Sequence, residues 1–302
     1  MKAGQKINMK YLIIGAGGTG GVTGYYMKKA GKDVTLIARG EHLKKIQKQG
    51  LTLEKMWDKT EENISIPATD MEHYAEHPDV IFVCVKGYSL QETIPFIKRI
   101  ARKNTIVIPV LNIYGTGGKM QKELPDLLVT DGCIYVSANI KEPGKLLQHG
   151  QILHIVFGVR DKAEFRPELK EIQKDLCDSH IDGTLSENIR REALEKFSYV
   201  SPIGAAGLYY HATAADFQKE GEARELFKTL IREIVTLANA MGITFEEDLV
   251  ERNLKILSNL PEEATTSMQR DVIEGKQSEI DGLVYEVVRM AKKYGVEVPA
   301  YE

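Results

Sequence analysis

Cysteine is scarce in this sequence: only Cys84, Cys133 and Cys177 occur among 302 residues. An odd number of cysteines this far apart supports neither a disulfide framework nor a zinc site, so we expect a reducing, cytoplasmic location. The seven histidines also lack the spacing of metal ligands, and no metal is expected.

Long apolar runs and an excess of one charge are missing as well. No stretch approaches the roughly 20 apolar residues that a membrane helix needs. Residues 1–8 contain no apolar stretch that could act as a signal peptide. The 40 Lys and Arg nearly balance the 43 Asp and Glu, giving a formal net charge of −3. We therefore expect no membrane and no nucleic-acid partner, although a few local cations could hold a small anion.

The remaining composition is that of a soluble globular protein, with 43% hydrophobic and 27% charged residues. The length allows two domains, each with its own core. Strand-like runs alternate with helical stretches up to about Ser186, and helical patterns follow. We predict an α/β fold, with a Rossmann-type doubly wound domain over residues 1–186 and an all-helical domain over residues 187–302.

A glycine-rich turn carries the first functional signal. The apolar run Tyr11–Ile14 leads into the turn, and a helical stretch and a second apolar run, Val34–Ala38, follow it. This order is the context that a dinucleotide-binding fingerprint requires, with an ordinary βα turn as the alternative. The three fingerprint glycines permit a tight turn, close approach of a pyrophosphate, and close packing of helix on strand. The predicted cofactor-binding residues of the turn are Gly15, Ala16, Gly17, Gly18, Thr19 and Gly20.

The residue at the end of the second strand indicates which dinucleotide binds. NAD-binding proteins usually place an acidic residue there, which accepts a hydrogen bond from the ribose 2′-OH. Here that residue is Arg39, whose planar guanidinium suits a 2′-phosphate. Arg39 therefore predicts NADP (NADPH) as the cofactor, with a solvated loop charge as the alternative.

Two further apolar runs, residues 79–85 and 105–111, are each followed by a polar residue, Lys86 and Asn112. Ligands of open α/β sheets bind outside the carboxyl ends of the strands, where the glycine turn and Arg39 also fall. We predict that Lys86 and Asn112 belong to the cofactor and substrate site, rather than being turn residues alone. The β-rich stretch 128–158 is predicted to pair at the edge of this sheet.

The helical half contains amphipathic helices whose apolar stripes are core positions. Three polar residues stand apart from these stripes: Lys196 within one helical stretch, Ser267 before another, and Glu279 at the start of the last long helix. From the pattern alone each is open to a structural role. Lys196 could be a solvated charge, and Ser267 and Glu279 could be helix-start residues.

Taken together, these motifs resemble the ketopantoate reductase (2-dehydropantoate 2-reductase) family from about Lys10 onward. The most specific part is the spacing in the second half, which chance reproduces far less readily than a glycine turn. The segments that carry the resemblance are the glycine turn with Arg39, Val83-Cys-Val-Lys86, Asn112, Glu142-Pro-Gly144, His149-Gly150, Thr266-Ser-Met-Gln-Arg-Asp271, Gly275-Lys276 and Ser278-Glu-Ile-Asp281.

The resemblance implies a role for each polar residue. Lys196 matches the catalytic lysine, which protonates the carbonyl oxygen as hydride reaches the carbon. Glu279 matches the carboxylate near that lysine, the substrate and the cofactor, and Ser267 matches the serine that binds the substrate carboxylate. Lys86 and Asn112 match residues that line the cofactor and substrate cleft. A free lysine has a pKa near 10.4, so Lys196 is charged without tuning and suits a developing oxyanion.

At three positions the sequence departs from the family's pattern. Asparagines usually stand four and eight residues after the catalytic lysine, where this chain has Val200 and Gly204. The usual Asn-Gly is Asn112-Ile113. These changes concern the identity of the substrate. The hydroxyl groups of Ser198, Tyr199 or Ser201 are candidates to replace the missing amides.

We therefore expect NADPH-dependent reduction of a 2-oxo acid to a 2-hydroxy acid. The first candidate is 2-dehydropantoate (ketopantoate) to pantoate, in pantothenate biosynthesis, by a protein that is a candidate homodimer. Reduction of another 2-oxo acid by the same residues is the alternative. A non-catalytic NADPH-binding sensor is a hypothesis of a different class, which turnover distinguishes because a sensor binds NADPH without oxidising it.

Overall fold

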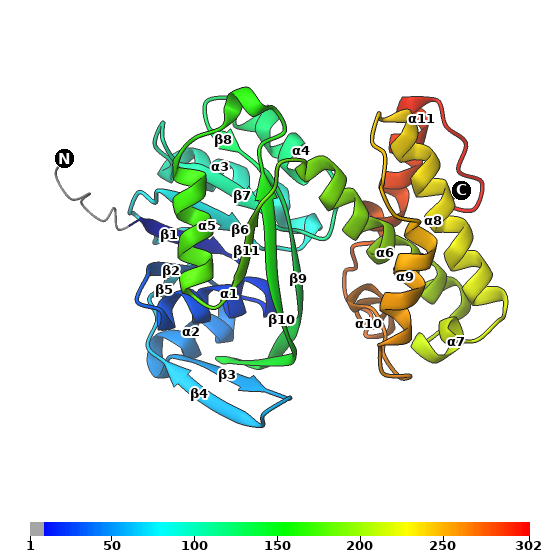
Figure 1. The fold of residues 1–302 in the computed structure, drawn as a ribbon. Helices are drawn as coiled ribbons and strands as arrows, with labels where there is room; N and C mark the ends of the chain where they lie inside the picture. The colour runs from blue at the N-terminus through cyan, green and yellow to red at the C-terminus, as the bar shows by residue number, and fades with distance from the viewer. Residues whose placement is uncertain (1–8) are drawn as a thin grey trace. The chain divides into compact units, whose positions relative to one another are not determined.

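The computed structural model describes residues 9–302, which form two compact units (Figure 1). Among the described residues, the first unit comprises residues 9–111 together with Gly115–Ile189. The second comprises Asn112–Tyr114 and Arg190–Glu302. The division after Ile189 lies close to the junction predicted after Ser186. No pattern in the sequence indicates that Asn112–Tyr114 belong with the helices.

The first unit contains eleven strands, five α-helices and two short 3₁₀ segments within the described residues. In chain order they are β1 (Lys10–Ile14), α1 (Gly18–Lys29), β2 (Asp33–Ile37), α2 (Gly40–Gln49), β3 (Leu51–Lys55), β4 (Thr60–Ile64), β5 (Ala68–Thr69), β6 (Val80–Val83), η1 (Gly87–Ser89), α3 (Leu90–Ile100), β7 (Ile106–Pro109), α4 (Thr116–Glu123), β8 (Leu128–Val129), β9 (Asp131–Glu142), β10 (Lys145–Gly158), η2 (Lys162–Glu164), α5 (Glu168–Asp178) and β11 (Asp182–Leu185).

The main sheet is parallel and has the order β5-β2-β1-β6-β7-β8. This is the strand order of a Rossmann-type sheet, in which the order reverses beside β1. Side chains of β1 alternate between its two faces, because Tyr11 and Ile13 join one apolar core while Leu12 and Ile14 join another. Burial on both faces explains the nearly continuous apolar runs of β1, β6 and β7. The predicted doubly wound domain is confirmed.

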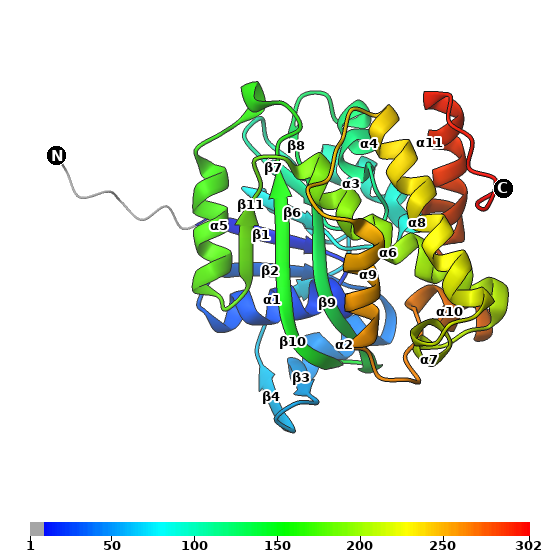
Figure 2. The same cartoon turned by 45° about the vertical axis from the view of Figure 1, so that its right-hand side comes forward.

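One part of the sheet prediction is wrong. Within residues 128–158 only β8 pairs at the edge of the main sheet. The long strands β9 and β10 instead form a second sheet with β3, β4 and β11 (Figure 2). The first part of β10 pairs with β3 and its last part with β11, both in parallel. Such pairing joins segments far apart in the chain, which a local pattern does not reveal.

Helix α1 packs between the two sheets, and its glycines permit the close approach. A Cβ built on Gly20 would lie 2.1 Å from the carbonyl oxygen of Gly15, the residue that follows β1. A Cβ on Gly18 would lie 2.2 Å from the carbonyl oxygen of Ala138 on β9. One on Gly21 would lie 2.7 Å from Leu146 on β10. The start of α1 is thus in close contact with strands of the second sheet and with the end of β1.

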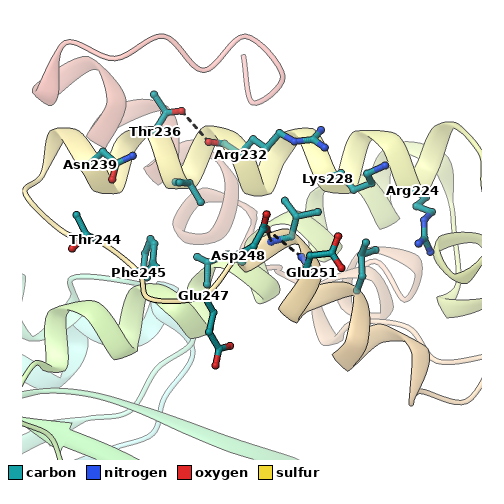
Figure 3. A pocket seen from close by; sticks show the side chains of 14 residues that line it. Arg224, Lys228, Arg232, Thr236, Asn239, Thr244, Phe245, Glu247, Asp248 and Glu251 are labelled. Carbon is teal, nitrogen blue, oxygen red and sulfur yellow. Dashed lines mark hydrogen bonds between the residues drawn. The ribbon is translucent and has the colours of Figure 1, made fainter.

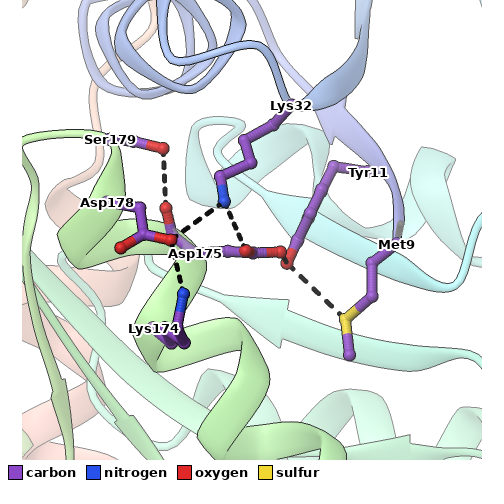
Figure 4. Close-up of polar contacts among 7 residues, drawn as sticks. All are labelled: Met9, Tyr11, Lys32, Lys174, Asp175, Asp178 and Ser179. Carbon is purple, nitrogen blue, oxygen red and sulfur yellow. Dashed lines mark hydrogen bonds and ion pairs between the residues drawn. The ribbon is translucent and has the colours of Figure 1, made fainter. Parts of the chain in front are cut away.

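A polar network ties β1 to helix α5 (Figure 4). The hydroxyl group of Tyr11 donates to Asp175 at 2.6 Å, and Lys32 forms an ion pair with the same carboxylate. Burial, followed by this hydrogen bond to Asp175, raises the pKa of Tyr11 far above its usual value. The network fixes α5 beside the amino end of β1.

The second unit is helical, with a core that includes Leu194, Phe197, Phe227 and Ile234. The carboxylate of Glu233 in the middle of this unit accepts hydrogen bonds from the backbone N–H groups of Ala300 (2.8 Å) and Tyr301 (3.2 Å), near the end of the chain. No helix in residues 9–302 is both long and apolar enough to cross a membrane. The elements are α6 (Ile189–Tyr210), α7 (Ala214–Gln218), α8 (Glu222–Ala240), α9 (Leu249–Ser258), α10 (Ser267–Ile273), the π-helical segment η3 (Asp281–Tyr285) and α11 (Glu286–Tyr294).

Candidate active site

The glycine turn between β1 and α1 has the geometry of a tight βα connection. Gly15 has a φ of +101°, a conformation that favours glycine. Its N–H donates to Ile37 at the end of β2, and a Cβ there would lie 3.0 Å from the backbone of Cys84. Burial raises the pKa of the Cys84 thiol to about 12, so this cysteine is a packing residue.

Gly17 differs from its neighbours because it faces open space. A Cβ built there would have no heavy atom within 4 Å. Gly17 is the N-cap of α1, no side chain caps its N–H groups, and its first turn contains no acidic residue. The start of α1 therefore offers unpaired N–H groups and the positive end of a helix dipole, which fit the diphosphate of a dinucleotide.

Arg39 is the N-cap of α2, two residues after the end of β2. Its side chain is exposed, and no salt bridge to it occurs within the described part of the chain. A guanidinium in this state is available to an anionic ligand. Lys86 also belongs to the first unit, where it is half-buried and is the N-cap of the short 3₁₀ segment η1. Strand pairing ends at Val83 and Pro109, so neither Lys86 nor Asn112 follows its strand directly.

The structure also singles out His42, which no motif of the sequence marks. Its Nε2 lies 2.9 Å from the carbonyl oxygen of Ala16 in the glycine turn. Its Nδ1 lies 3.0 Å from the backbone nitrogen of Gly144, in the turn between β9 and β10. A histidine that contacts the predicted phosphate-binding turn belongs to the description of the site.

In the second unit, Lys196 of α6 donates a hydrogen bond to the side-chain oxygen of Asn112 at 2.7 Å. Lys196 is buried, with 8% of its surface exposed. These two predicted site residues are therefore brought together, although 84 positions separate them. The hydrogen bond to the amide oxygen of Asn112 gives the buried side-chain nitrogen of Lys196 a defined position.

The segment after Asn112 is fitted into the helical core. Ile113 lies against Gly282 of η3, where a Cβ would be 2.2 Å from Cδ1 of the isoleucine. Tyr114 packs against Phe197, with ring centroids 6.1 Å apart. The large Ile113, in place of the family's usual glycine, is thus accommodated by a glycine opposite it. These contacts hold Asn112 beside α6.

Ser267 is the first residue of α10, and Thr266 is its N-cap. Thr266 and Gln269 form a capping box, in which Thr266 accepts the N–H of Gln269 at 3.2 Å. The sequence pattern allowed Ser267 to be a helix-start residue, but the residue that caps α10 is Thr266. Ser267 is half-buried, and its hydroxyl group has no hydrogen bond to another described residue. This hydroxyl is available to a ligand.

Glu279 lies just before the last helical segment, and its side chain is buried, with 5% exposed. Its carbonyl oxygen accepts the N–H of Leu283 at 2.9 Å and that of Gly282 at 3.1 Å. The π-helical turn Asp281–Tyr285 begins two residues after Glu279. Such turns occur often at functional sites. Glu279 and Lys196 are both buried ionisable residues of the second unit, which carries Ser267 as well.

The positions that lack the family's asparagines are apolar in the structure. Val200 is half-buried and packs on the helical core. A Cβ on Gly204 would lie 2.7 Å from the terminal methyl group of Met268. Met268 thus fills the space that a side chain at 204 would need. Helix α6 continues through Pro202 to Tyr210, so the proline does not redirect this stretch.

The nearby hydroxyl groups have other partners. Ser198 donates to the carbonyl of Glu195 at 2.6 Å and accepts from Asn253 at 3.0 Å. Ser201 bonds the carbonyl oxygen of Leu283 and the hydroxyl of Tyr301. Both serines are fully buried, so they serve the fold. Tyr199 packs edge-on against Phe227, and burial raises its pKa to about 12.

A cavity of 780 Å³ opens between α8 and α9 of the second unit (Figure 3). None of the predicted site residues lines it. Two of the three cations that line it pair with carboxylates of the protein, Lys228 with Glu225 at 2.6 Å and Arg224 with Glu220 at 3.4 Å. Asp248 caps α9. We assign no ligand to this cavity.

The fold and these residues define a two-domain oxidoreductase of the Rossmann type with a helical second domain. The chain belongs to the ketopantoate reductase family. Residues 11–162 match the family described as ketopantoate reductase PanE/ApbA, and residues 188–302 match its C-terminal part. The resemblance stated from the motifs is confirmed. The protein is therefore an enzyme that acts on a keto group.

Individual relatives are similar over nearly the whole chain. The 2-dehydropantoate 2-reductase of Pyrococcus horikoshii is 28% identical, over 96% of this chain and 93% of its own. An uncharacterized oxidoreductase of Bacillus subtilis, YkpB, is 22% identical over 97% and 96%. Among solved structures, D-mandelate dehydrogenase with NADH and anilino(oxo)acetate has a TM-score of 0.86. It is 21% identical and covers 97% of this chain and 95% of its own.

Proposed function

We propose that this protein uses NADPH to reduce the keto group of a small 2-oxo acid, and that ketopantoate is the first substrate to test. The observation that carries the proposal is the buried Lys196, which is held by Asn112 at 2.7 Å. A lysine in this state has a defined position and a proton to give. Ser267, with an available hydroxyl group, and buried Glu279 belong to the same unit.

The first unit supplies the residues for the cofactor. The N–H groups at the start of α1 would bind the diphosphate, and the open space at Gly17 allows its approach. Arg39 would pair with a 2′-phosphate, which favours NADPH over NADH. The bound cofactor supplies a hydride to the carbonyl carbon of the substrate.

The second unit supplies the proton and the substrate contacts. Lys196 protonates the carbonyl oxygen, and its positive charge stabilises the negative charge that develops there. Asn112 orients the ammonium group while remaining neutral. The Ser267 hydroxyl donates to the substrate carboxylate, and Glu279 favours the charged form of the lysine.

A less polar 2-oxo acid is the second candidate, because Val200 and Met268 make the neighbourhood of α6 apolar. A protein of the same fold, D-mandelate dehydrogenase, binds anilino(oxo)acetate, which is itself an aromatic 2-oxo acid derivative. The test is NADPH oxidation by the purified protein against a panel of 2-oxo acids, from ketopantoate to branched and aromatic members. Tight NADPH binding with no oxidation by any of them would contradict the proposal and favour a sensor.

A further inference from the structure

His42, the third residue of α2, connects two turns that lie far apart in the sequence. The N–H group of Gly144 can only donate, so Nδ1 of His42, 3.0 Å away, is the acceptor. Nε2 then carries the proton and donates to the carbonyl oxygen of Ala16 at 2.9 Å. The two contacts fix both the neutral state of the imidazole and its tautomer.

The contact to Ala16 determines where the next N–H group points. A peptide unit is planar and trans, so its C=O and N–H groups point in opposite directions. Because His42 holds the Ala16 carbonyl on its own side, the N–H of Gly17 points away from His42. Gly17 is also the residue that faces open space, with no heavy atom within 4 Å of a Cβ built there.

The other end of this connection is equally fixed. Gly144 has a φ of +80° and forms the turn between β9 and β10. Its N–H donates to His42, and its carbonyl oxygen accepts the N–H of Thr52 on β3 at 2.9 Å. A Cβ on Gly144 would lie 2.9 Å from Cβ of Lys45 on α2. His42 therefore accepts a hydrogen bond from the β9–β10 turn of the second sheet and donates one to the glycine turn.

We propose that His42 is a positioning residue of the dinucleotide site, which orients the Ala16–Gly17 peptide so that its N–H group meets the bound diphosphate. This inference rests on the proposed binding of NADPH. Half-burial of the ring lowers the pKa of His42 below its ordinary value, in agreement with the neutral state. Loss of the donor to Ala16 should weaken NADPH binding by about threefold to tenfold, the value of one neutral hydrogen bond.

Three variants separate the two contacts. His42→Gln keeps a donor in reach of Ala16, His42→Asn keeps an acceptor near Gly144, and His42→Leu removes both. The matched control is His77→Leu, because Nδ1 of His77 also bonds a backbone carbonyl, that of Ile100 at 2.8 Å. The measurements are the NADPH dissociation constant, kcat at saturating NADPH, and the urea midpoint of each variant.

We expect weaker NADPH binding in His42→Leu and His42→Asn, near wild-type binding in His42→Gln, and an unchanged kcat at saturating NADPH in all three. His77→Leu should lose stability without losing affinity. Wild-type affinity in His42→Leu and His42→Asn, or an equal loss in His77→Leu, would overturn the inference. Wild-type protein that binds NADPH but reduces no 2-oxo acid would overturn only the proposed reductase. Wild-type protein that binds no dinucleotide would overturn both.

Discussion

The side-chain nitrogen of Lys196 lies 2.7 Å from the side-chain oxygen of Asn112, and this contact joins two sequence motifs within one helical unit. Asn112 follows a strand of the first unit but belongs by its contacts to the second. Ile113 and Tyr114, packed on Gly282 and Phe197, keep it there. The segment Asn112–Tyr114, which follows β7 in the chain, thus positions Lys196, the proposed proton donor.

Replacing Lys196 tests its role as the proton donor. Lys196→Ala should lower kcat by about 10²- to 10⁴-fold, the usual contribution of a general acid, and leave NADPH affinity nearly unchanged. Stopped-flow kinetics and NADPH titration measure the two effects. The control is Lys228→Ala, which removes a surface lysine paired with Glu225. Near wild-type turnover in folded Lys196→Ala would exclude the lysine from the mechanism.

Substitution by alanine should affect different properties at two glycines of the turn: cofactor binding at Gly17 and stability at Gly20. Gly17→Ala meets open space at a φ of −73°, so the stability of the free protein should stay within about 0.5 kcal/mol of wild type. NADPH binding should weaken, because the methyl group occupies the approach of the diphosphate. Gly20→Ala should instead destabilise the fold by about 1–3 kcal/mol, since its Cβ would lie 2.1 Å from the Gly15 carbonyl oxygen.

Urea unfolding and NADPH titration of both variants check this pair. If Gly17→Ala bound NADPH as tightly as wild type, the diphosphate would not approach this glycine. If Gly20→Ala were as stable as wild type, α1 would have room to shift away from β1.

Arg39 should determine the choice between NADPH and NADH. A charge-assisted hydrogen bond contributes about 1.5–3 kcal/mol, so Arg39→Ala should weaken NADPH binding by about ten- to a hundredfold. NADH binding should hardly change, because NADH lacks the 2′-phosphate. Arg102→Ala, at another exposed arginine of the same unit, is the control. Equal losses for both cofactors would show that Arg39 does not contact the 2′-phosphate.

Local signals made the first sheet and the glycine turn predictable. The turn is bounded by apolar runs, and Gly20 lies against Gly15 and Ile13, which are only a few residues before it. The apolar stripes likewise located the long helices of the second unit. The family motif led to Ser267 and Glu279, whose patterns alone left structural roles open.

Contacts between distant segments were not predictable in the same way. The pairing of β10 with β3 joins Lys145 to Thr52, and no periodicity reports which strands pair across such a separation. His42 is one polar residue of an amphipathic helix in the sequence, and only its two backbone contacts distinguish it. The sequence also does not explain how Ile113 fits where the family usually has glycine. The structure does, because Gly282 lies against it and leaves room for its side chain.

The stability of the protein should depend on pH through His42. Burial lowers its folded-state pKa below the unfolded value of about 6.5, so the unfolded state binds the proton more readily. The stabilisation is complete above that value and is lost as pH falls through the folded-state pKa. The unfolding free energy of wild type relative to His42→Gln should therefore start to fall as the pH drops toward about 6.5 and keep falling below it. A difference that stays constant or grows would contradict this assignment.

The substrate site should not strongly prefer ketopantoate over an analogue that lacks its 4-hydroxyl group. Val200 offers no hydrogen bond, and Met268 fills the space beside Gly204. Ser198 and Ser201 are fully buried and bonded elsewhere, so they are poor replacements for the missing amides. A site built to bond a substrate hydroxyl rejects the analogue without it strongly, because a polar group is left unpaired. Without such a group, that penalty disappears.

The measurement compares kcat/KM for ketopantoate and for its analogue without the 4-hydroxyl. We expect the ratio to lie between about unity and a hundredfold in favour of the analogue, because burying the hydroxyl unpaired against Val200 costs ketopantoate about 1–3 kcal/mol. Val200→Asn should shift the ratio toward ketopantoate. Gly204→Asn is the control, since Met268 obstructs its side chain and the ratio should stay low. A preference of wild type for ketopantoate by a hundredfold or more would show that another residue bonds the hydroxyl, and that the site is not relaxed.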